Sequence, residues 1–510
     1  MMNNIRKAVS ILVLGSAMLA ISGTSSCTGQ THSITILHTN DLHASFLPHE
    51  AFWIPGEPKP LVGGFKELWW AVDSIRRAKA ESAILLLDGG DVMTGSPISE
   101  MDYNGSTGGA MFEMMNRIGY DAWAVGNHDL DISQENLRQH AAMAKFPTLS
   151  ANLRDSLDGL AFHNQEYVIL KKDDARIGII GLITKDLFTV TNTNNLKGVK
   201  VLPPADVMQR IVDKIAGETD LIVALTHEGA DDDSVLAAST HGVNVIIGAH
   251  SHTRLKVPKY VNGVVICQTG SNCENLGELE LTFENRKVTR YNGKLLPLWV
   301  HNHPENAFTK FVDEYKSKVD QDYGEVLGTL TLGWKRDAKG ESNIGDFVAD
   351  AMREAANADI AITNSSGIRK DLPAGKIRKV DLFEIAPFRN VLCTFTLTGG
   401  EIRGFVQRYL NAVVDGKPST QHAGITCRWK RADGKPVIEK ITVGGKELQD
   451  DRSYSCAVSD FVINQADKYL GLTPANIDFS TMTILQTLVA KVRKDKILSA
   501  QIEHRIQEVQ

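Results

Sequence analysis

A repeated local pattern constrains the fold of this 510-residue chain more than any other feature of its sequence. Short β-branched or Leu-rich runs each end in a polar cluster, and a more helical stretch follows. Such runs are typical of strands buried on both faces of a sheet. Their polar ends would gather at one edge, where α/β proteins keep functional groups. We therefore expect an α/β domain built from the runs 34–37, 83–87, 122–125, 147–150, 176–183, 221–225, 243–247 and 264–267.

The residues that end these runs carry the side chains that divalent metal ions bind. Asp-x-His and His-x-His spacing puts both side chains of a pair on one side of an extended strand. Carboxylates, an amide oxygen and imidazoles suit borderline cations such as Zn, Mn, Fe or Co. Each residue alone is more often an ordinary turn or surface residue, but five such strand ends in one domain are hard to produce by chance. The candidate ligands are Asp41, His43, Asp91, Asn127, His227, His250 and His252.

His128 follows Asn127 directly and is a candidate to donate or take a proton. Asp131 is close enough in the sequence to orient its ring. A carboxylate such as Asp91 can bridge two ions, and two-metal sites serve in-line attack at phosphorus. These residues therefore predict a phosphoester hydrolase.

The order of these motifs resembles the calcineurin-like metallophosphoesterases. The fuller stretches 37–43, 126–131 and 248–252 resemble the bacterial 5′-nucleotidase branch of that family. The resemblance implies an α/β fold with an N-terminal four-layer αββα sandwich, a linker helix and a separate C-terminal α+β substrate domain. The C-terminal domain would rotate between open and closed positions.

The same resemblance implies two divalent metal ions, Zn, Mn or similar. His128 would stabilise the transition state or help the leaving group, with Asp131 holding its ring. The implied ligands are Asp41, His43, Asp91 and His252 for one ion, and Asp91 as a bridge, Asn127, His227 and His250 for the other.

The sequence divides into four parts. Residues 1–27 form a signal peptide with a lipobox, and residues 32–302 form the metallophosphoesterase domain. Residues 303–324 form a linker helix with apolar residues on one face, and residues 325–510 form the substrate domain.

The C-terminal part also resembles this family, at 341–345, 364–369, 386–388 and 397–399. By this resemblance Asn364 and Arg369 face the ligand, and an arginine fork suits a phosphate or carboxylate. Phe461 would stack on a nucleobase, and Asp467 would make a polar contact. This chain departs from the family at 465–467, where it has Gln-Ala-Asp rather than Gly-Gly-Asp, and it lacks a second ring and some arginines. These departures leave the substrate open.

The first residues indicate export. A basic pair, Arg6 and Lys7, precedes the apolar run 11–21, which is too short to span a bilayer. Cys27 follows small residues and resembles a bacterial lipoprotein box, although Thr24 stands where Leu is usual. We expect a periplasmic or cell-envelope lipoprotein attached by a lipid on Cys27, with simple secretion as the alternative. Six cysteines are too few for a disulfide framework, so Cys267 and Cys273 either bridge a turn or are free buried thiols.

The predicted function is release of phosphate from nucleoside 5′-monophosphates by an exported enzyme. The alternatives within the enzyme class are cyclic nucleotides, nucleotide sugars and non-nucleotide phosphoesters. A catalytically silent surface binding protein is less favoured, because no ligand and neither member of the His–Asp pair is missing. A net charge of −6 argues against a nucleic-acid polymer as the partner.

Overall fold

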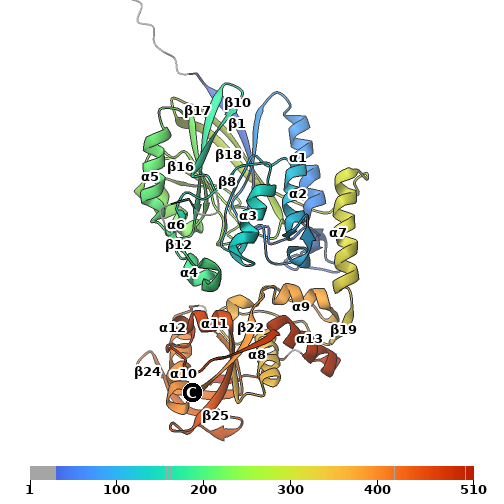
Figure 1. Cartoon of the computed structure of the whole chain (residues 1–510), viewed down its shortest axis with the longest axis vertical. Coiled ribbons are helices and arrows are strands. Elements are labelled where there is room, and N and C mark those ends of the chain that lie inside the picture. The colour runs from blue at the N-terminus through green and yellow to red at the C-terminus, as the bar shows by residue number, and fades with distance from the viewer. Residues whose placement is uncertain (1–29, 156–158, 161–163, 418–419, 500, 510) are drawn as a thin grey trace, which may run out of the picture.

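The computed structural model describes residues 30–155, 159–160, 164–417, 420–499 and 501–509, which form two domains (Figure 1). The predicted signal and lipobox segment, Cys27 included, lies outside the described residues. Helix α7 (Ala307–Tyr323) lies within the predicted linker and leads into the C-terminal domain. Its Val312 and Tyr315 are buried, as the expected apolar face requires.

Two six-stranded sheets form the N-terminal domain, and every run expected to be a strand is one. The first sheet has the order β18 (Lys287–Pro297), β17 (Asn275–Glu284), β1 (His32–Thr39), β4 (Ala83–Asp88), β7 (Ala122–Ala124), β8 (Thr148–Leu149). The second has the order β10 (Tyr167–Lys172), β11 (Ala175–Ile183), β13 (Leu221–His227), β14 (Val245–Ile247), β16 (Val264–Cys267), β15 (Lys259–Val261).

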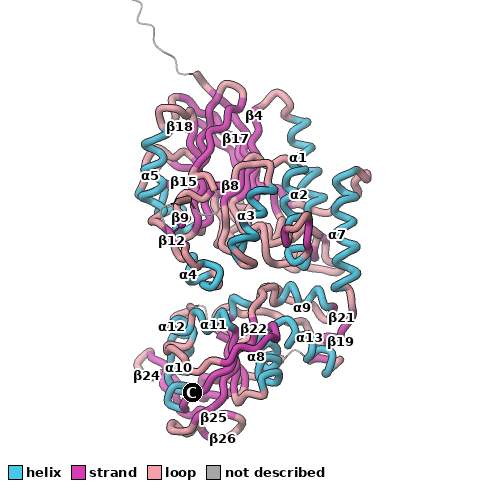
Figure 2. The backbone as a smooth tube through the Cα atoms, in the orientation of Figure 1, coloured by secondary structure: helices cyan, strands magenta, loops and turns pink. Residues whose placement is uncertain are grey.

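The sheets pack face to face, and helices cover their outer faces (Figure 2). Successive residues of a strand serve different cores: Ile36 packs between the sheets, whereas Leu37 packs against the outer helices. The first sheet is covered by α1 (Phe65–Ala78), α2 (Gly109–Ile118) and α3 (Gln134–Met143), and the second by α5 (Pro204–Ile215) and α6 (Ala230–Ser239). The expected four-layer αββα sandwich is confirmed. The remaining short strands and α-helix are β2 (His49–Glu50), β3 (Leu61–Val62), β5 (Asp102–Tyr103), β6 (Ser106–Thr107), β9 (Leu153–Asp155), β12 (Val199–Val201) and α4 (Leu187–Val190).

The C-terminal domain is centred on a five-stranded mixed sheet. Its order is β23 (Thr420–Ala423), β20 (Ile360–Asn364), β27 (Ser453–Ser459), β22 (Val391–Thr398), β28 (Asp478–Thr483). One core joins this sheet to α8 (Asn343–Ala356) and α13 (Ile484–Asp495), and another joins it to α10 (Gly399–Val414). Two smaller sheets comprise β26 (Lys446–Glu447), β25 (Lys435–Val443), β24 (Ile425–Ala432) and β30 (Ile506–Glu508), and β21 (Gly375–Arg378), β19 (Val326–Leu330) and β29 (Ile497–Leu498).

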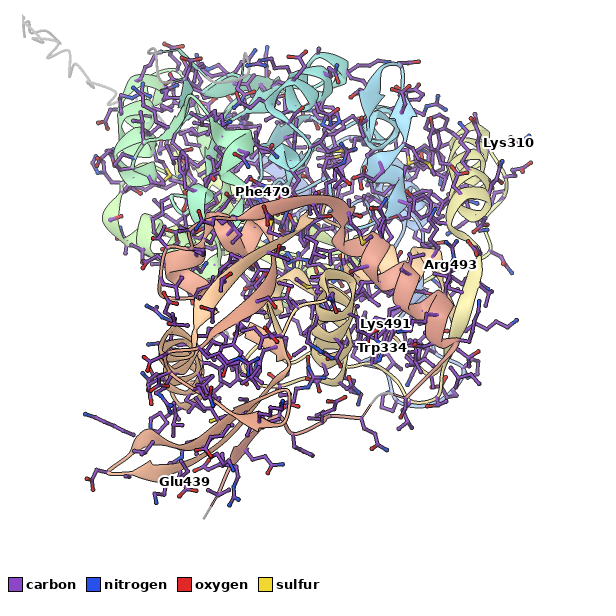
Figure 3. The ribbon with its side chains drawn as sticks, turned by 60° about the horizontal axis from the view of Figure 1, so that its bottom comes forward. Lys310, Trp334, Glu439, Phe479, Lys491 and Arg493 are labelled. Atoms are coloured by element: carbon purple, nitrogen blue, oxygen red, sulfur yellow. The ribbon has the colours of Figure 1, made fainter. Side chains whose placement is uncertain are left out.

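Ion pairs tie α13 to its neighbours at the surface of this domain. Lys491 reaches Glu354 on α8 at 2.7 Å, and Arg493 reaches Glu325 just before β19 at 2.6 Å. Figure 3 shows both basic residues on α13, which crosses the front of the domain. The five described cysteines are free and buried, so Cys267 and Cys273 are not bridged.

The two domains contact each other at both ends of their junction. Arg389 Nη2 lies 2.5 Å from Glu100 Oε2. At the other end α4 approaches α11 (Asp460–Asn464) and α12 (Ala466–Tyr469), as Figure 1 shows. There the Asn192 amide donates to Asp460 Oδ2 at 3.1 Å. The junction brings the loops at the ends of β20 and β27 toward the edge of the sandwich that carries the polar strand ends.

Candidate metal centre and substrate contacts

The structure brings all seven predicted ligand side chains together at the carboxyl ends of strands from both sheets. Six of them form two groups, and within each group the donor atoms lie within 4.8 Å of one another. Asn127 joins the second group, because its Oδ1 lies 3.2 Å from His227 Nε2. The groups are Asp41, His43 and His252, and Asp91, His227 and His250.

Left-handed backbone, rather than an extended strand, turns these side chains inward. Strand β1 ends at Thr39 and β14 ends at Ile247, so the Asp-x-His and His-x-His pairs lie in loops. The expectation that alternation in an extended strand aligns each pair is therefore wrong. Such φ angles cost non-glycine residues about 1–3 kcal/mol each and persist where function requires the geometry. The φ angles are 51° at Asp41, 47° at His43, 57° at Asp91, 72° at His250 and 53° at His252.

Backbone carbonyls orient two of the imidazoles. Nδ1 of His43 lies 3.1 Å from Thr94 O, and Nδ1 of His227 lies 2.9 Å from Gly89 O. When each Nδ1 carries the proton and donates it there, the lone pair of Nε2 faces the cluster. A metal-ligating histidine usually makes such a hydrogen bond from the ring nitrogen that does not bind the metal.

The electrostatics of the cluster also suit cations. Burial lowers the pKa of His250 to about 4 and that of His252 to about 3, so both rings are neutral and free to ligate. Burial acts to raise the pKa of Asp91, but His227 and His128 outweigh it and hold that carboxyl ionised. Burial acts to lower the pKa of His227, but Asp91 outweighs it and raises the value to about 10. Positive charge at this Nε2, from a proton or a metal ion, is therefore favoured. The donor chemistry fits divalent metal ions.

His128 and Asp131 are paired as predicted. His128 Nδ1 lies 2.7 Å from Asp131 Oδ2, and the backbone N–H of His128 donates to Asp91 Oδ1 at 2.7 Å. Burial acts to lower the pKa of His128, but the carboxylates of Asp131 and Asp91 outweigh it, so the net shift is upward. The upward shift of the pKa favours the protonated form of this ring beside the metal groups.

One residue that stabilises the site was missed from the sequence. Asp129 is buried, and its carboxylate accepts four backbone N–H groups. It thereby joins the loop after β4 to the loop after β7. Nothing in the sequence distinguishes this acid from its neighbour Asp131. The four donors belong to Asp91 (3.1 Å), Val92 (3.0 Å), Met93 (3.1 Å) and Gly126 (2.8 Å).

The C-terminal domain presents Arg369 to the metal cluster. Its positive charge helps to lower the pKa of His43, His250 and His252. Burial lowers the pKa of Arg369 itself, and the nearby Asp91 opposes this shift without reversing it. Asn364 ends β20 and donates to Ser366 Oγ at 2.9 Å. Phe388, which the sequence offered only as a family landmark, lies with its ring centroid 5.5 Å from that of His128.

The predicted base-binding segment lies at the junction of the domains. Phe461 is in α11 and contacts Tyr469, with ring centroids 6.1 Å apart and an interplanar angle of 52°. Asp467 is exposed on α12. Gln465, which departs from the family pattern, donates its amide to Phe188 O of the N-terminal domain at 2.6 Å.

Comparisons with known proteins agree with this architecture. The family model described as calcineurin-like phosphoesterase matches residues 34–254, and that of the 5′-nucleotidase C-terminal domain matches residues 326–473. Protein UshA of Yersinia enterocolitica is 28% identical over 496 residues, covering 86% of this chain and 87% of its own length. A 5′-nucleotidase of Vibrio cholerae is 27% identical and covers 87% of each chain.

A comparison with solved structures supports the same two-domain architecture. The crystal structure of a 5′-nucleotidase precursor from Thermus thermophilus superposes with a TM-score of 0.80 at 27% identity, covering 94% of this chain and 99% of that one. Its fold therefore extends over both domains. The chain therefore carries a calcineurin-like phosphoesterase domain followed by a 5′-nucleotidase C-terminal domain, and it is a metal-dependent phosphoester hydrolase.

Proposed function

We propose that this protein hydrolyses nucleoside 5′-monophosphates at a centre of two divalent metal ions. The observation that carries the proposal is the position of Arg369. This cation of the C-terminal domain faces a cluster of seven metal-binding side chains in the phosphoesterase domain. A phosphate group has the charge to bind between the two.

Two ions of Zn or Mn would share the cluster, with Asp91 as the bridge. The first would be held by Asp41, His43, Asp91 and His252, and the second by Asp91, Asn127, His227 and His250. When bound, such ions supply Lewis acidity for in-line attack of water on phosphorus.

The chain's own residues bind the substrate and manage charge and protons. The Arg369 guanidinium binds phosphate oxygens, for which its fork of N–H groups is well shaped. His128 donates the N–H of Nδ1 to Asp131, and the upward shift of its pKa favours a second proton on Nε2. From Nε2 it stabilises the charge that develops on the phosphoryl oxygens, or it protonates the departing ester oxygen.

The nucleoside would lie against Phe461, with Asn364 and Asp467 as polar contacts. One observation favours a different leaving group as the second candidate. Phe461 is tilted by 52° against Tyr469, so these two rings are not the parallel pair between which a nucleobase would stack. Cyclic nucleotides, nucleotide sugars or a non-nucleotide phosphoester are the alternatives to a 5′-monophosphate.

Export and lipid attachment at Cys27 belong to the same proposal. They rest on the basic, apolar and small-residue order of residues 1–27. Within the described part of the chain, no helix is both long and apolar enough to cross a membrane.

Phosphate release from a panel of nucleoside mono-, di- and cyclic phosphates, with p-nitrophenyl phosphate and added Mn or Zn, tests the proposal. We expect release from 5′-monophosphates that falls about 100-fold or more in His128→Ala. His241→Ala is the matched control, since this histidine is highly exposed. Release from p-nitrophenyl phosphate alone would reject the nucleotide substrate and keep the metal centre.

A further inference from the structure

The stretch 268–270 (Gln-Thr-Gly) follows β16 as a polar strand end, yet it supplies none of the seven metal-binding side chains. Strand β16 runs parallel to β14, so its carboxyl end lies at the edge of the sandwich that carries His250 and His252. The side chains of Gln268 and Thr269 are buried there, and each of their polar atoms has a hydrogen-bond partner. Burial of polar groups is costly unless they are bonded, so their partners indicate what these two residues stabilise.

Gln268 holds the loop that carries the His-x-His pair of the second sheet. Its Oε1 accepts the backbone N–H of Thr253 at 2.8 Å and the hydroxyl of Ser251 at 2.9 Å, and its Nε2 donates to the carbonyl oxygen of Ala249. These three partners alternate with the two ligands along the loop 249–253, so one amide is bonded before, between and after them. Both histidines have left-handed φ angles, which persist where surrounding contacts impose them.

Thr269 and Gly270 hold the loop of the first sheet through Asn40. The Oδ1 atom of Asn40 accepts the backbone N–H of Thr269 at 2.8 Å and its hydroxyl at 2.7 Å. The Nδ2 atom of Asn40 donates to Gly270 O at 2.7 Å and to Asp41 Oδ2 at 2.7 Å. The buried amide of Asn40 therefore links the position of Thr269 and Gly270 to the carboxylate of Asp41.

The two loops follow strands of different sheets, because β1 lies in the first sheet and β14 in the second. Their separation therefore depends on contacts between loops rather than on a strand ladder. The stretch 268–270 makes such contacts with both loops, and the backbone N–H of His250 adds another by donating to Asp41 Oδ1 at 3.1 Å and Oδ2 at 3.0 Å. The second metal group depends on other contacts, such as the backbone N–H of Asp91 that donates to Asp129 Oδ2 at 3.1 Å.

We propose that Gln268 and Thr269 are positioning residues that set the distance between Asp41 and His252 and thereby the affinity for the first ion. The second ion should depend on them less, because His250 is its one ligand in the two loops that they hold. Loss of these contacts should leave a protein that binds one ion well and the other poorly. The inference rests on the proposed two-ion centre and adds two residues that act through its ligands.

The test titrates Mn into the metal-free protein by calorimetry, with His252→Ala to show which binding step belongs to the first ion. Gln268→Met keeps the length of the side chain and removes its polar end. We expect it to weaken binding of the first ion about 10- to 100-fold, because contacts that orient ligands contribute that much to metal affinity, and to leave the second within about threefold. Thr269→Val removes the hydroxyl bond to Asn40 but keeps the backbone one, so it should weaken the first ion by less than about 10-fold.

Electron paramagnetic resonance of the Mn-loaded protein gives a second readout without turnover. Two Mn ions bridged by a carboxylate couple magnetically, whereas a single bound ion does not. At a metal concentration that just fills both sites of the parent protein, the parent should give the coupled spectrum and Gln268→Met that of an isolated ion. A role confined to folding would lower the melting temperature of the metal-free protein and leave both affinities and the spectrum unchanged.

Gln209→Met is the matched control, because the amide of Gln209 on α5 also makes hydrogen bonds. It donates to Asp213 Oδ1 at 2.8 Å and accepts the backbone N–H of His241 at 2.9 Å. Both affinities and the coupled spectrum should be unchanged in this variant. If Gln268→Met does not fold, Ser251→Ala takes its place, since it removes one contact of Gln268 from an exposed residue and should weaken the first ion about threefold or more.

The outcomes separate this proposal from the proposed function. Unchanged affinity for both ions in Gln268→Met would overturn the proposal. An equal loss of affinity for both ions would also overturn it, since the contacts would then not act on the first ion in particular. If the parent protein binds a single ion, the proposed two-ion centre fails, and the comparison of Gln268→Met with Gln209→Met still decides whether Gln268 sets the affinity for the ion that binds.

Discussion

His43 and His252 face each other through their Nε2 atoms, which lie 2.9 Å apart. His43 lies in the loop after β1 of the first sheet and His252 in the loop after β14 of the second, so the pair joins the two layers at the edge that carries the metal groups. Burial lowers the pKa of both rings, and their mutual proximity lowers that of His43 further. Two neutral rings aimed at one point are the natural ligands of a shared cation.

Removal of metal should therefore destabilise the protein as well as inactivate it. Ions at a concentration 100 times their Kd would add about 2.7 kcal/mol, or roughly 5–10 °C in melting temperature. We expect a chelator to lower the melting temperature by that amount and Mn or Zn to restore it. Asp91→Asn removes the carboxylate charge that we propose bridges the two ions, and it should abolish the response. A melting temperature in Asp91→Asn that still rises with metal would contradict the assignment of Asp91.

Asp131 should set the pH range in which His128 is protonated. Its carboxylate, with that of Asp91, raises the pKa of His128 against the lowering effect of burial. If the protonated ring is the active form, activity falls as pH rises through this raised pKa. Asp131→Ala removes part of the upward shift, so the alkaline limb of the kcat profile should move to lower pH. The exposed Asp213→Ala is the control, and an unmoved limb in Asp131→Ala would show that another group causes it.

The proposed metal ligands could be predicted from sequence because each one lies only a few residues beyond the end of an apolar run. A buried strand determines the edge of the sheet at which the chain emerges. The position of Asn127 or His227 at that edge could therefore be predicted from the neighbouring residues alone. The backbone conformation could not be predicted in this way. Asp41 and His252 adopt left-handed φ angles that contacts between loops impose, such as Asp41 N to Gly90 O.

Contacts between the domains could not be predicted from local sequence patterns. Phe388 meets His128 only because the C-terminal domain docks beside the sandwich, and no periodicity in either segment specifies that packing. The resemblance supplied Arg369, whereas it did not indicate that Gln465 reaches Phe188 O. Long-range packing of this kind depends on the whole surface of both domains.

Arg369 should contribute through the shape of its fork as well as its charge. Hydrogen bonds to charged groups contribute about 1.5–3 kcal/mol, or about 10- to 100-fold in kcat/KM. We expect Arg369→Ala to lose about 100-fold and Arg369→Lys about 10-fold on any phosphomonoester, with weaker inhibition by inorganic phosphate. Arg403→Lys is the control, because Arg403 forms an exposed ion pair with Asp450, and it should leave kcat/KM unchanged. Equal activity of Arg369→Lys and the parent enzyme would mean that charge alone suffices.

Asp129 should matter more for stability than its neighbour Asp131, although both are carboxylates in one turn. Each oxygen of Asp129 accepts two backbone N–H groups, so the carboxylate needs two acceptor oxygens. In Asp129→Asn one of these oxygens becomes an amide that can only donate, and two buried N–H groups then lose their acceptor. Each loss costs about 1–3 kcal/mol, so we expect the free energy of unfolding of the N-terminal domain to fall by about 3 kcal/mol.

Denaturant unfolding of the metal-free protein measures this loss without interference from metal affinity. Asp131→Asn is the matched control, because its partner is the partly exposed ring of His128 and it should lower stability by less than about 1 kcal/mol. The two variants should also lose turnover for different reasons. Asp131→Asn should lose activity at full metal content, whereas Asp129→Asn should lose metal first, because the backbone of Asp91 is no longer fixed. Equal stability of the two variants would show that the four N–H groups find other acceptors.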